Sequence, residues 1–327
     1  MDLPLRKLGP FGVSAIGLGC MSMSHAYGTP PEPAAAADVL LKALDSGYTF
    51  FDTASLYGLG ANETLLGNTL KRRRGEFVLA SKCGMLRPRE PDSRPDALKQ
   101  TCEDSLRRLQ TDVIDLYYLH RWDKRVPLED CIGALGDMVR QGKIRTIGLS
   151  EVSAATLRKA HAVHPVAAVQ SEYSLWTRNP EIAVLDACRE IGAAFVAFSP
   201  LARGFLTGDL RDMSSLPPKD IRHAMPRFQS ENFTRNLKLL DGFAALAREN
   251  DCSMGQLALA WLLAKAPHVV PIPGTTRLDH LSENAAAAGL QLTPGAIQRM
   301  ELLINAHTVS GPRYNATTLP EIDTEGD

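Results

Sequence analysis

Short apolar runs alternate with longer amphipathic stretches along most of the chain. The apolar runs are nearly continuous, which is typical of parallel strands that are covered on both faces. Between them, apolar residues recur three and four positions apart, as in helices with one buried face. The predicted strands are 15–19, 48–52, 77–82, 113–120, 146–150, 168–172, 194–199 and 269–272, and the predicted helices include 34–46, 95–109, 128–140, 153–163, 180–191, 236–249 and 255–265.

Eight successive strand-helix units predict an α/β fold, a single (β/α)8 TIM barrel, whose core usually needs about 250 residues. The additional residues form extra elements. We expect an N-terminal β-hairpin at 3–14 on the barrel floor, a long loop at 203–235 after the seventh strand, and a further helix after Pro294. Residues 319–327 form a polar tail that we expect to be mobile. No linker or repeat divides the chain, so residues 1–327 are predicted to be one domain.

Composition excludes several functional classes. The 327 residues carry a net charge of -1, and the one basic run, 71–74, ends a predicted helix, where cations suit the helix dipole. No signal peptide and no apolar stretch of about 18 residues is found. The six cysteines form no CxxC pair, and His161 and His164 lack further metal ligands nearby. We therefore expect a soluble, cytoplasmic protein without a metal site, a nucleic-acid partner or a membrane partner.

An acid, a phenol, an ammonium and an imidazole follow three successive predicted strands. Asp52 ends the second strand with Tyr57 in its loop, Lys82 ends the third, and His120 ends the fourth. In such barrels the active site lies at the carboxyl ends of the strands. An ammonium lowers the pKa of a nearby phenol from about 10, and a carboxylate can hold that ammonium. Each residue alone could be structural, but together they predict that Asp52 fixes Lys82, that Lys82 tunes Tyr57, and that His120 orients a substrate oxygen.

Stretches from the second strand to the eighth resemble the aldo-keto reductase superfamily. They are FDTASLYG, LASKCG, DLYYLHRWD, IGLSEVS, VQSEYSLW, FSPLARGFL and IPGTTRLDHLSEN, in barrel order. The opening GLGCMSMSHAYG, the segment PRFQSENFTRNL and the turn IPGTTR are most similar to the auxin-induced-like and pyridoxal-reductase-like members. The resemblance implies an enzyme that binds NADPH across the barrel top and transfers a hydride to an aldehyde or ketone. It makes Tyr57 the general acid, Lys82 and Asp52 the pair that tunes it, and His120 the residue that orients the carbonyl.

The resemblance also implies a cofactor site. Ser150, Gln170 and, more loosely, Glu151 match residues near the nicotinamide carboxamide. Phe198 falls where the family commonly has a tyrosine stacked on the nicotinamide, so a hydroxyl contact would be lost. The expected cofactor-binding residues are Gly19, Met21, Asp52, Ser150, Gln170, Phe198, Ser199, Pro200, Leu201, Gly204, Leu206, Gly274, Thr275, Thr276, Arg277, Glu283 and Asn284.

The phosphate end of the cofactor can also be placed from the residues themselves. No GxGxxG opens a helix after a strand, so a Rossmann site is not supported. Barrels often bind phosphate with the loops after strands seven and eight, here 199–204 and 274–277. The guanidinium of Arg277 suits the 2′-phosphate, which favours NADPH over NADH. By resemblance, Glu283 and Asn284 lie near the adenine.

The predicted substrate pocket is apolar and aromatic, which suits small aldehydes, ketones or planar rings. Arg222 or Arg227 could bind a cofactor phosphate or a substrate anion, and the sequence does not separate these roles. The residues expected to line the pocket are Met21, Tyr27, Tyr57, His120 and Trp122.

Two other functions are compatible with parts of this pattern. An NADPH-binding, redox-sensing regulatory subunit resembling the potassium-channel β subunits would share the fold, but the four intact rim residues favour catalysis. A lyase or isomerase that uses Lys82 as a Schiff base would need a lysine without a paired acid, and it would leave Arg277 unexplained. We expect a small carbonyl substrate, and a monomer or weak homo-oligomer.

Overall fold

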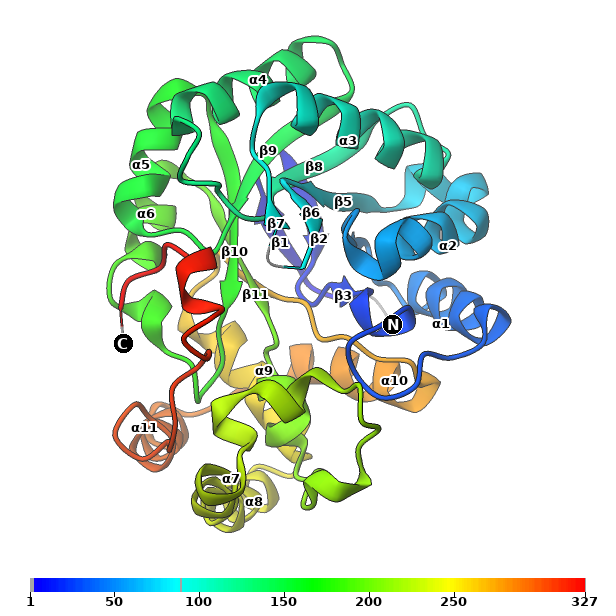
Figure 1. The fold of residues 1–327 in the computed structure, drawn as a ribbon. Helices are drawn as coiled ribbons and strands as arrows, with labels where there is room; N and C mark the ends of the chain where they lie inside the picture. Colours follow the sequence, from blue (N-terminus) through cyan, green and yellow to red (C-terminus); the bar gives the residue numbers. More distant parts are fainter. Residues whose placement is uncertain (1–2, 89, 327) are drawn as a thin grey trace.

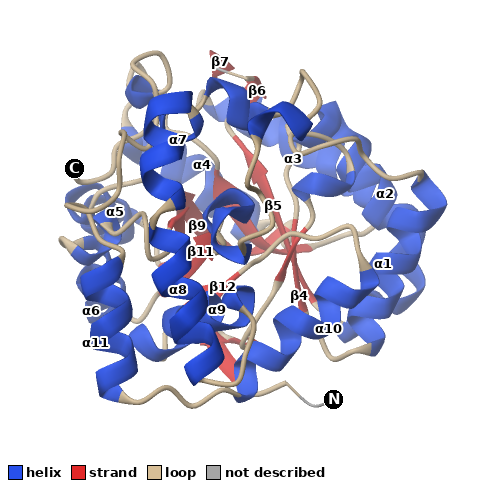
Figure 2. Ribbon diagram, turned by 90° about the horizontal axis from the view of Figure 1, so that it is seen from below, coloured by secondary structure: helices blue, strands red, loops and turns tan. Residues whose placement is uncertain are grey.

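The computed structural model describes residues 3–88 and 90–326, in which eight parallel strands lie inside a layer of helices (Figures 1 and 2). The strands pair in the order β12-β11-β10-β9-β8-β5-β4-β3. The two ends of this sheet meet, because the N–H of Gly17 donates to Pro271 at 3.0 Å and that of Gly19 to Pro273 at 3.2 Å. The predicted barrel is therefore confirmed. Its strands are β3 (Leu18–Gly19), β4 (Phe50–Asp52), β5 (Val78–Cys83), β8 (Ile114–Leu119), β9 (Ile144–Ser150), β10 (Val166–Glu172), β11 (Ala194–Phe198) and β12 (Val269–Pro271).

The surrounding helices agree with the amphipathic pattern to within a few residues. Within the described ranges, none of them combines the length and hydrophobicity needed to cross a bilayer. The helices are α1 (Pro33–Asp45), α2 (Ala61–Leu70), α3 (Pro95–Leu109), α4 (Leu128–Arg140), α5 (Ala154–Val163), α6 (Val184–Ile191), α7 (Ser230–Leu237), α8 (Leu239–Glu249), α9 (Met254–Lys265), α10 (Leu278–Ala286) and α11 (Pro294–Leu303).

The N-terminal hairpin of β1 (Leu5–Leu8) and β2 (Phe11–Ser14) lies against the barrel interior. Its buried side chains Leu8 and Val13 belong to the same apolar cluster as inward-facing residues of the strands, such as Phe50 and Leu116. The turn requires Gly9, whose φ is +55° and whose added Cβ would lie 2.8 Å from Ala167. The hairpin thus covers the floor of the barrel, and ligands are expected at the opposite end, where the carboxyl ends of the strands lie.

Residues 203–235 are more ordered than the predicted long loop. The segment forms short 3₁₀ turns and then α7, and a short helix break at Lys238 separates α7 from α8. Buried aromatic rings anchor it, since Phe228 and Phe233 contact each other and Phe228 also packs on Trp176. A second hairpin, β6 (Met85–Arg87) with β7 (Glu90–Pro91), follows β5 and had no signal in the apolar pattern.

The C-terminal segment is docked on the barrel instead of extending as a free tail (red in Figure 1). Asp323 pairs with Val152, and its carboxylate accepts a hydrogen bond from Thr156 Oγ1 at 2.6 Å. Glu325 accepts from the N–H of Ala154 at 2.7 Å. Both carboxylates thus lie at the N-terminus of α5, where the helix dipole favours negative charge. Residue 327 of the predicted tail lies outside the described residues.

Candidate active site

The ends of β4 and β5 bring a buried ion pair against a phenol. Lys82 is fully buried, and its ammonium forms an ion pair with Asp52. The same Nζ donates to the carbonyl of Thr53 at 2.8 Å and lies 3.2 Å from the hydroxyl of Tyr57. The second oxygen of Asp52 accepts from Gln170 Nε2 at 2.7 Å. The structure therefore connects three of the four predicted rim residues in one hydrogen-bonded chain.

The loop after β4 places Tyr57 by a left-handed turn. Tyr57 opens a short 3₁₀ segment in which Gly58, Leu59 and Gly60 have φ values of 57°, 52° and 94°. Glycine adopts this conformation without the clash that a side chain would meet. The turn directs the half-buried phenol back over the rim, above Lys82.

His120 completes the group from the next strand. Its ring centroid lies 5.9 Å from that of Tyr57, with the two rings nearly perpendicular. The imidazole is 8% exposed, and its Nδ1 is buried without a hydrogen-bond partner among the described residues. Burial, reinforced by the positive charges of Arg121 and Lys82, holds the pKa of His120 well below 6.5. The imidazole is therefore neutral at neutral pH.

Burial changes the expected electrostatics of Tyr57. It raises the pKa of the phenol above 10, and the nearby ammonium of Lys82 opposes this rise without cancelling it. Lys82 therefore lowers the pKa of Tyr57 in the predicted direction, but desolvation of the phenolate is the larger effect and the net pKa lies above its ordinary value. Burial lowers the pKa of Lys82, but Asp52 and Tyr57 outweigh it, so the net pKa lies above 10.5 and the ammonium stays charged.

The residues expected at the nicotinamide lie side by side on the next strand ends. Ser150 and Gln170 are register partners on β9 and β10, and Phe198 is half-buried at the end of β11. Ser150 Oγ accepts a hydrogen bond at 3.1 Å from Arg121 Nη1. Sequence reasoning missed Arg121, although its place directly after His120 was a usable signal. Glu151, in contrast, turns away to a separate cluster of charges.

That cluster, which we call the buried quartet, consists of Glu151, Glu172, Arg203 and Arg313. Glu151 pairs with Arg313, whose Nε lies 3.3 Å from Glu172, and Arg203 pairs with Glu172 at 2.6 Å. All four side chains are at most 6% exposed. The quartet joins two strand ends to the loop after β11 and to the C-terminal segment.

The quartet and its neighbours already engage several side chains that were expected near the ligands. Tyr27, expected to line the substrate pocket, accepts a hydrogen bond from Arg203 Nη1 at 2.9 Å, so its hydroxyl is already engaged. Arg203 itself is held by Glu172 and Tyr27. Of the two arginines considered for an anion, Arg222 holds Asp220 at 2.7 Å and Arg227 donates to Thr177 at 2.7 Å. The side chains of both arginines are thus engaged in contacts within the protein.

The expected phosphate end of the site is exposed. The side chain of Arg277 is 63% exposed, and it forms a two-pronged pair with Asp279 at 3.0 and 2.5 Å. Glu283 accepts from Ser253 Oγ at 2.5 Å, and Asn284 is buried beside it on α10. A phosphate at Arg277 would therefore compete with Asp279.

The loop after β11 and the turn before α10 complete the expected cofactor surface. Left-handed backbone at Ser199 and Gly204, with φ of 48° and 88°, lets the chain turn sharply there. Where the loops after β3 and β12 meet, an added Cβ on Gly274 would lie 3.4 Å from Ser22 Oγ. This hydroxyl is buried and has no hydrogen-bond partner in the described part of the chain, as expected of a group that binds a ligand. The other expected residues here are Gly19, Met21, Leu201 and Thr276, which are half-buried, and Pro200, Leu206 and Thr275, which are buried.

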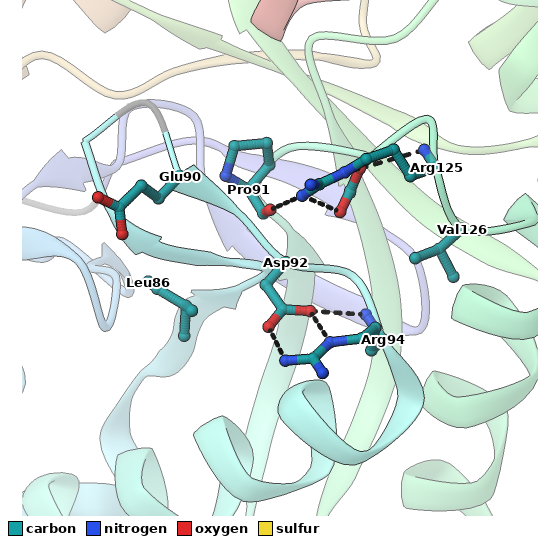
Figure 3. A pocket seen from close by; sticks show the side chains of 8 residues that line it. Leu86, Glu90, Pro91, Asp92, Arg94, Arg125 and Val126 are labelled. Atoms are coloured by element: carbon teal, nitrogen blue, oxygen red, sulfur yellow. Dashed lines mark hydrogen bonds and ion pairs between the residues drawn. The ribbon is translucent and has the colours of Figure 1, made fainter.

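The second hairpin and the loop after β8, which also carries Trp122, form a cleft (Figure 3). The indole of Trp122 is half-buried and donates to the carbonyl of Val126 at 2.9 Å. The cleft has a volume of about 940 Å³, and Figure 3 shows its two arginines held by neighbouring carboxylates. The lining residues are Leu86, Glu90, Pro91, Asp92, Arg94, Asp123, Arg125 and Val126. No group of three or more side chains suited to a metal ion is found among the described residues.

Comparison with known proteins identifies relatives of this chain. The model of the aldo/keto reductase family matches residues 15–305. The aldo-keto reductase yakc of Schizosaccharomyces pombe, whose name specifies NADP(+), is 44% identical over 96% of this chain and 95% of its own. A probable aldo-keto reductase of Glycine max is 41% identical over 94% of this chain and 91% of its own.

Solved structures give the same result. A glycerol dehydrogenase from Gluconobacter oxydans has a TM-score of 0.84 and 27% identity, covering 93% of this chain and 95% of its own. An aldo-keto reductase from Klebsiella pneumoniae, solved in complex with NADPH, has a TM-score of 0.74 and 28% identity, covering 93% and 96%.

Proposed function

The chain belongs to the aldo/keto reductase family, and we propose that it reduces aldehydes or ketones to alcohols with NADPH, using Tyr57 as the proton donor. The observation that supports this most is the chain of contacts from Asp52 through Lys82 to the hydroxyl of Tyr57. The phenol at the end of this chain also lies beside the neutral imidazole of His120, and the combination is suited to proton transfer.

The chemistry that bound NADPH would supply is a hydride for the carbonyl carbon. Tyr57 supplies the proton to the carbonyl oxygen, and Lys82 stabilises the phenolate that remains until solvent reprotonates it. Because burial keeps the pKa of Tyr57 above 10, the phenol is protonated at neutral pH and ready to donate. The protonated form that reduction requires is therefore the populated one.

His120 and Asp52 assist without exchanging protons. The neutral imidazole of His120 can donate one N–H to the carbonyl oxygen and orient it toward Tyr57, because its depressed pKa prevents it from carrying a charge. Asp52 holds Lys82, and Gln170 holds Asp52 from the opposite side at 2.7 Å. Gln170 thus serves the ion pair as well as its expected contact with the carboxamide.

The cofactor surface supports NADPH binding by residues from several strand ends. Ser150, Gln170 and Phe198 would receive the nicotinamide, and the buried hydroxyl of Ser22 offers a donor that finds no partner in the described chain. Arg277 would bind the 2′-phosphate once Asp279 yields its guanidinium. This competition would reduce affinity somewhat without removing the preference for NADPH.

The test is a fluorescence titration with NADPH and NADH, followed by NADPH consumption with a panel of aldehydes, quinones and ketosteroids. We expect tighter binding of NADPH and turnover of at least one carbonyl compound. Tyr57→Phe should retain NADPH binding and lose about 10²- to 10⁴-fold in kcat. The reductive rate should show no inflection near 6.5, the ordinary pKa of histidine, and should fall only at alkaline pH as Tyr57 loses its proton.

The same experiment separates the regulatory alternative. Tight NADPH binding with no turnover of any carbonyl compound would favour a redox-sensing subunit resembling the potassium-channel β subunits. Turnover by Tyr57→Phe at the wild-type rate would remove Tyr57 as the proton donor.

A further inference from the structure

Arg121 projects a positive charge into the catalytic rim. It follows His120 at the end of β8, and its Nη1 donates to the carbonyl of His120 at 2.6 Å and to Ser150 Oγ at 3.1 Å. These two bonds span the ends of β8 and β9 and fix the position of the half-buried guanidinium. A side chain held in this way keeps its charge at one place instead of sampling solvent.

The charge of Arg121 acts on the residues that would contact the substrate. It is among the causes that lower the pKa of His120, and it also opposes the rise in the pKa of Tyr57. Such coupling requires proximity, because electrostatic effects fall with distance. A group bound to Arg121 would therefore lie next to a carbonyl held between Tyr57 and His120.

Other cations around the barrel mouth already have anions. Lys82 pairs with Asp52, and Arg203 with Glu172. In the cleft of Figure 3, Arg94 pairs with Asp92 at 2.7 Å and Arg125 with Asp123 at 2.8 Å. These arginines have little left to offer a ligand.

Arg121 differs from them in having no carboxylate within ion-pair distance in residues 3–88 and 90–326. Its Nε and Nη2 also make no hydrogen bond to the described chain, so one edge of the planar fork is open. A half-buried cation has lost part of its hydration, and an anion that binds to it compensates for that loss. The open edge matches the two oxygens of a carboxylate.

We propose that Arg121 is a subsite for a carboxylate carried by the carbonyl substrate, so that the protein prefers oxo acids or carboxylated aldehydes over neutral ones of the same shape. This inference rests on the proposed reductase function and adds the substrate class to it. The carboxylate would pair with the free edge of the guanidinium while the carbonyl oxygen lies at Tyr57 and His120.

The test compares a matched pair of substrates, 4-carboxybenzaldehyde and its methyl ester, in wild type and in Arg121→Gln. The wild type should prefer the acid by about tenfold to a hundredfold in kcat/KM, a typical gain for a charge-assisted pair. Arg121→Gln should bring the acid-to-ester ratio close to one, mainly through a higher KM for the acid. Arg121→Lys should keep part of the ratio, because it retains the charge without the fork.

The ratio is the decisive readout, because removing a charge near Tyr57 can lower turnover of both substrates together. A merely structural or electrostatic role would reduce both rates and leave the ratio unchanged, which would overturn the proposal. Arg125→Gln is the matched control, since it removes an arginine of the same loop that is already paired with Asp123. It should leave the wild-type ratio.

The outcomes also separate this inference from the proposed function. Turnover of the ester without preference for the acid in wild type would contradict the carboxylate subsite and leave the reductase intact. No turnover of either aldehyde, with turnover of another carbonyl compound of the panel, would contradict the subsite alone. No turnover of any carbonyl compound, with NADPH bound, would contradict both.

Discussion

Two buried charge networks lie at the carboxyl ends of the barrel strands, and they differ in how they end. The catalytic chain runs from Asp52 and Lys82 to Tyr57, whose hydroxyl is half-buried and can meet a ligand. In the buried quartet, each carboxylate meets an arginine and no member is more than 6% exposed. Both networks are charge-balanced, both join neighbouring strand ends, and both reach a half-buried phenol, since Arg203 donates to the hydroxyl of Tyr27. Only the phenol of the first network, Tyr57, also lies beside the imidazole of His120.

The contrast teaches that burial of charge near a barrel mouth is not by itself a sign of catalysis. A buried ion pair often contributes little net stability, while the loss of one partner is costly. The ion pairs of the quartet connect the loop after β11 and the C-terminal segment to the strands. The catalytic chain uses the same physics to keep an ammonium beside a phenol.

Lys82→Met should have the largest effect, because it should impair both catalysis and the stability of the fold. It removes the cation that stabilises the phenolate, so kcat should fall by about 10²- to 10⁴-fold. It also leaves Asp52 buried without its partner, which should reduce the free energy of unfolding by about 3–5 kcal/mol. Steady-state kinetics below the melting temperature and urea unfolding measure the two effects. A kcat within tenfold of wild type would remove Lys82 from the proton-transfer machinery.

Arg313→Met should distinguish the roles of the two networks, because it should reduce stability without reducing catalysis. It leaves Glu151 without its cation and should reduce the free energy of unfolding by about 3–5 kcal/mol, as in the first network. The kcat of the folded variant should stay within about threefold of wild type, since Arg313 does not contact Tyr57 or His120. Arg299→Met, which removes a pair on the surface with Glu249, is a control that should shift the melting temperature little. A large loss of kcat would mean that the quartet positions the reaction centre.

Arg277→Ala tests the exposed end of the cofactor site. We expect the Kd for NADPH to rise by about tenfold to a hundredfold and the Kd for NADH to change far less, because only NADPH carries the 2′-phosphate. Fluorescence titration with both cofactors gives the comparison. Asp279→Asn sharpens it, since freeing the guanidinium from its present partner should tighten NADPH binding. Equal losses for both cofactors would show that Arg277 does not read the phosphate.

The difference between the two networks also explains what the sequence could predict. Asp52, Lys82 and His120 end predicted strands and Tyr57 lies in the loop after the second one, so the strand pattern was enough to place them on one rim. The quartet gave no such signal. Glu151 and Arg313 are separated by 162 positions, and nothing local to Arg313 indicates that its segment returns to the barrel.

Other misses have related physical causes. Tertiary packing of aromatic residues such as Phe233 orders α7, whereas its local sequence is mostly polar. The direction of the pKa shift at Tyr57 depends on how much burial opposes Lys82, and burial depends on the whole fold. Arg121 directly follows a predicted catalytic residue in the sequence. Its role as an anion-binding residue could be inferred only from the structure, because no carboxylate of the described residues lies near it.

Asp323→Ala is expected to have the smallest effect, and it tests whether the docked C-terminal segment depends on the quartet alone. The Asp323 carboxylate accepts hydrogen bonds from Thr156 and Ser153 at the N-terminus of α5. Losing these bonds should reduce the free energy of unfolding by about 1 kcal/mol and leave kcat unchanged. The double variant with Arg313→Met distinguishes two cases. Additive losses in urea unfolding would mean that the segment is held at two independent points, whereas a smaller combined loss would mean that Arg313 already releases it and that the quartet controls the docking.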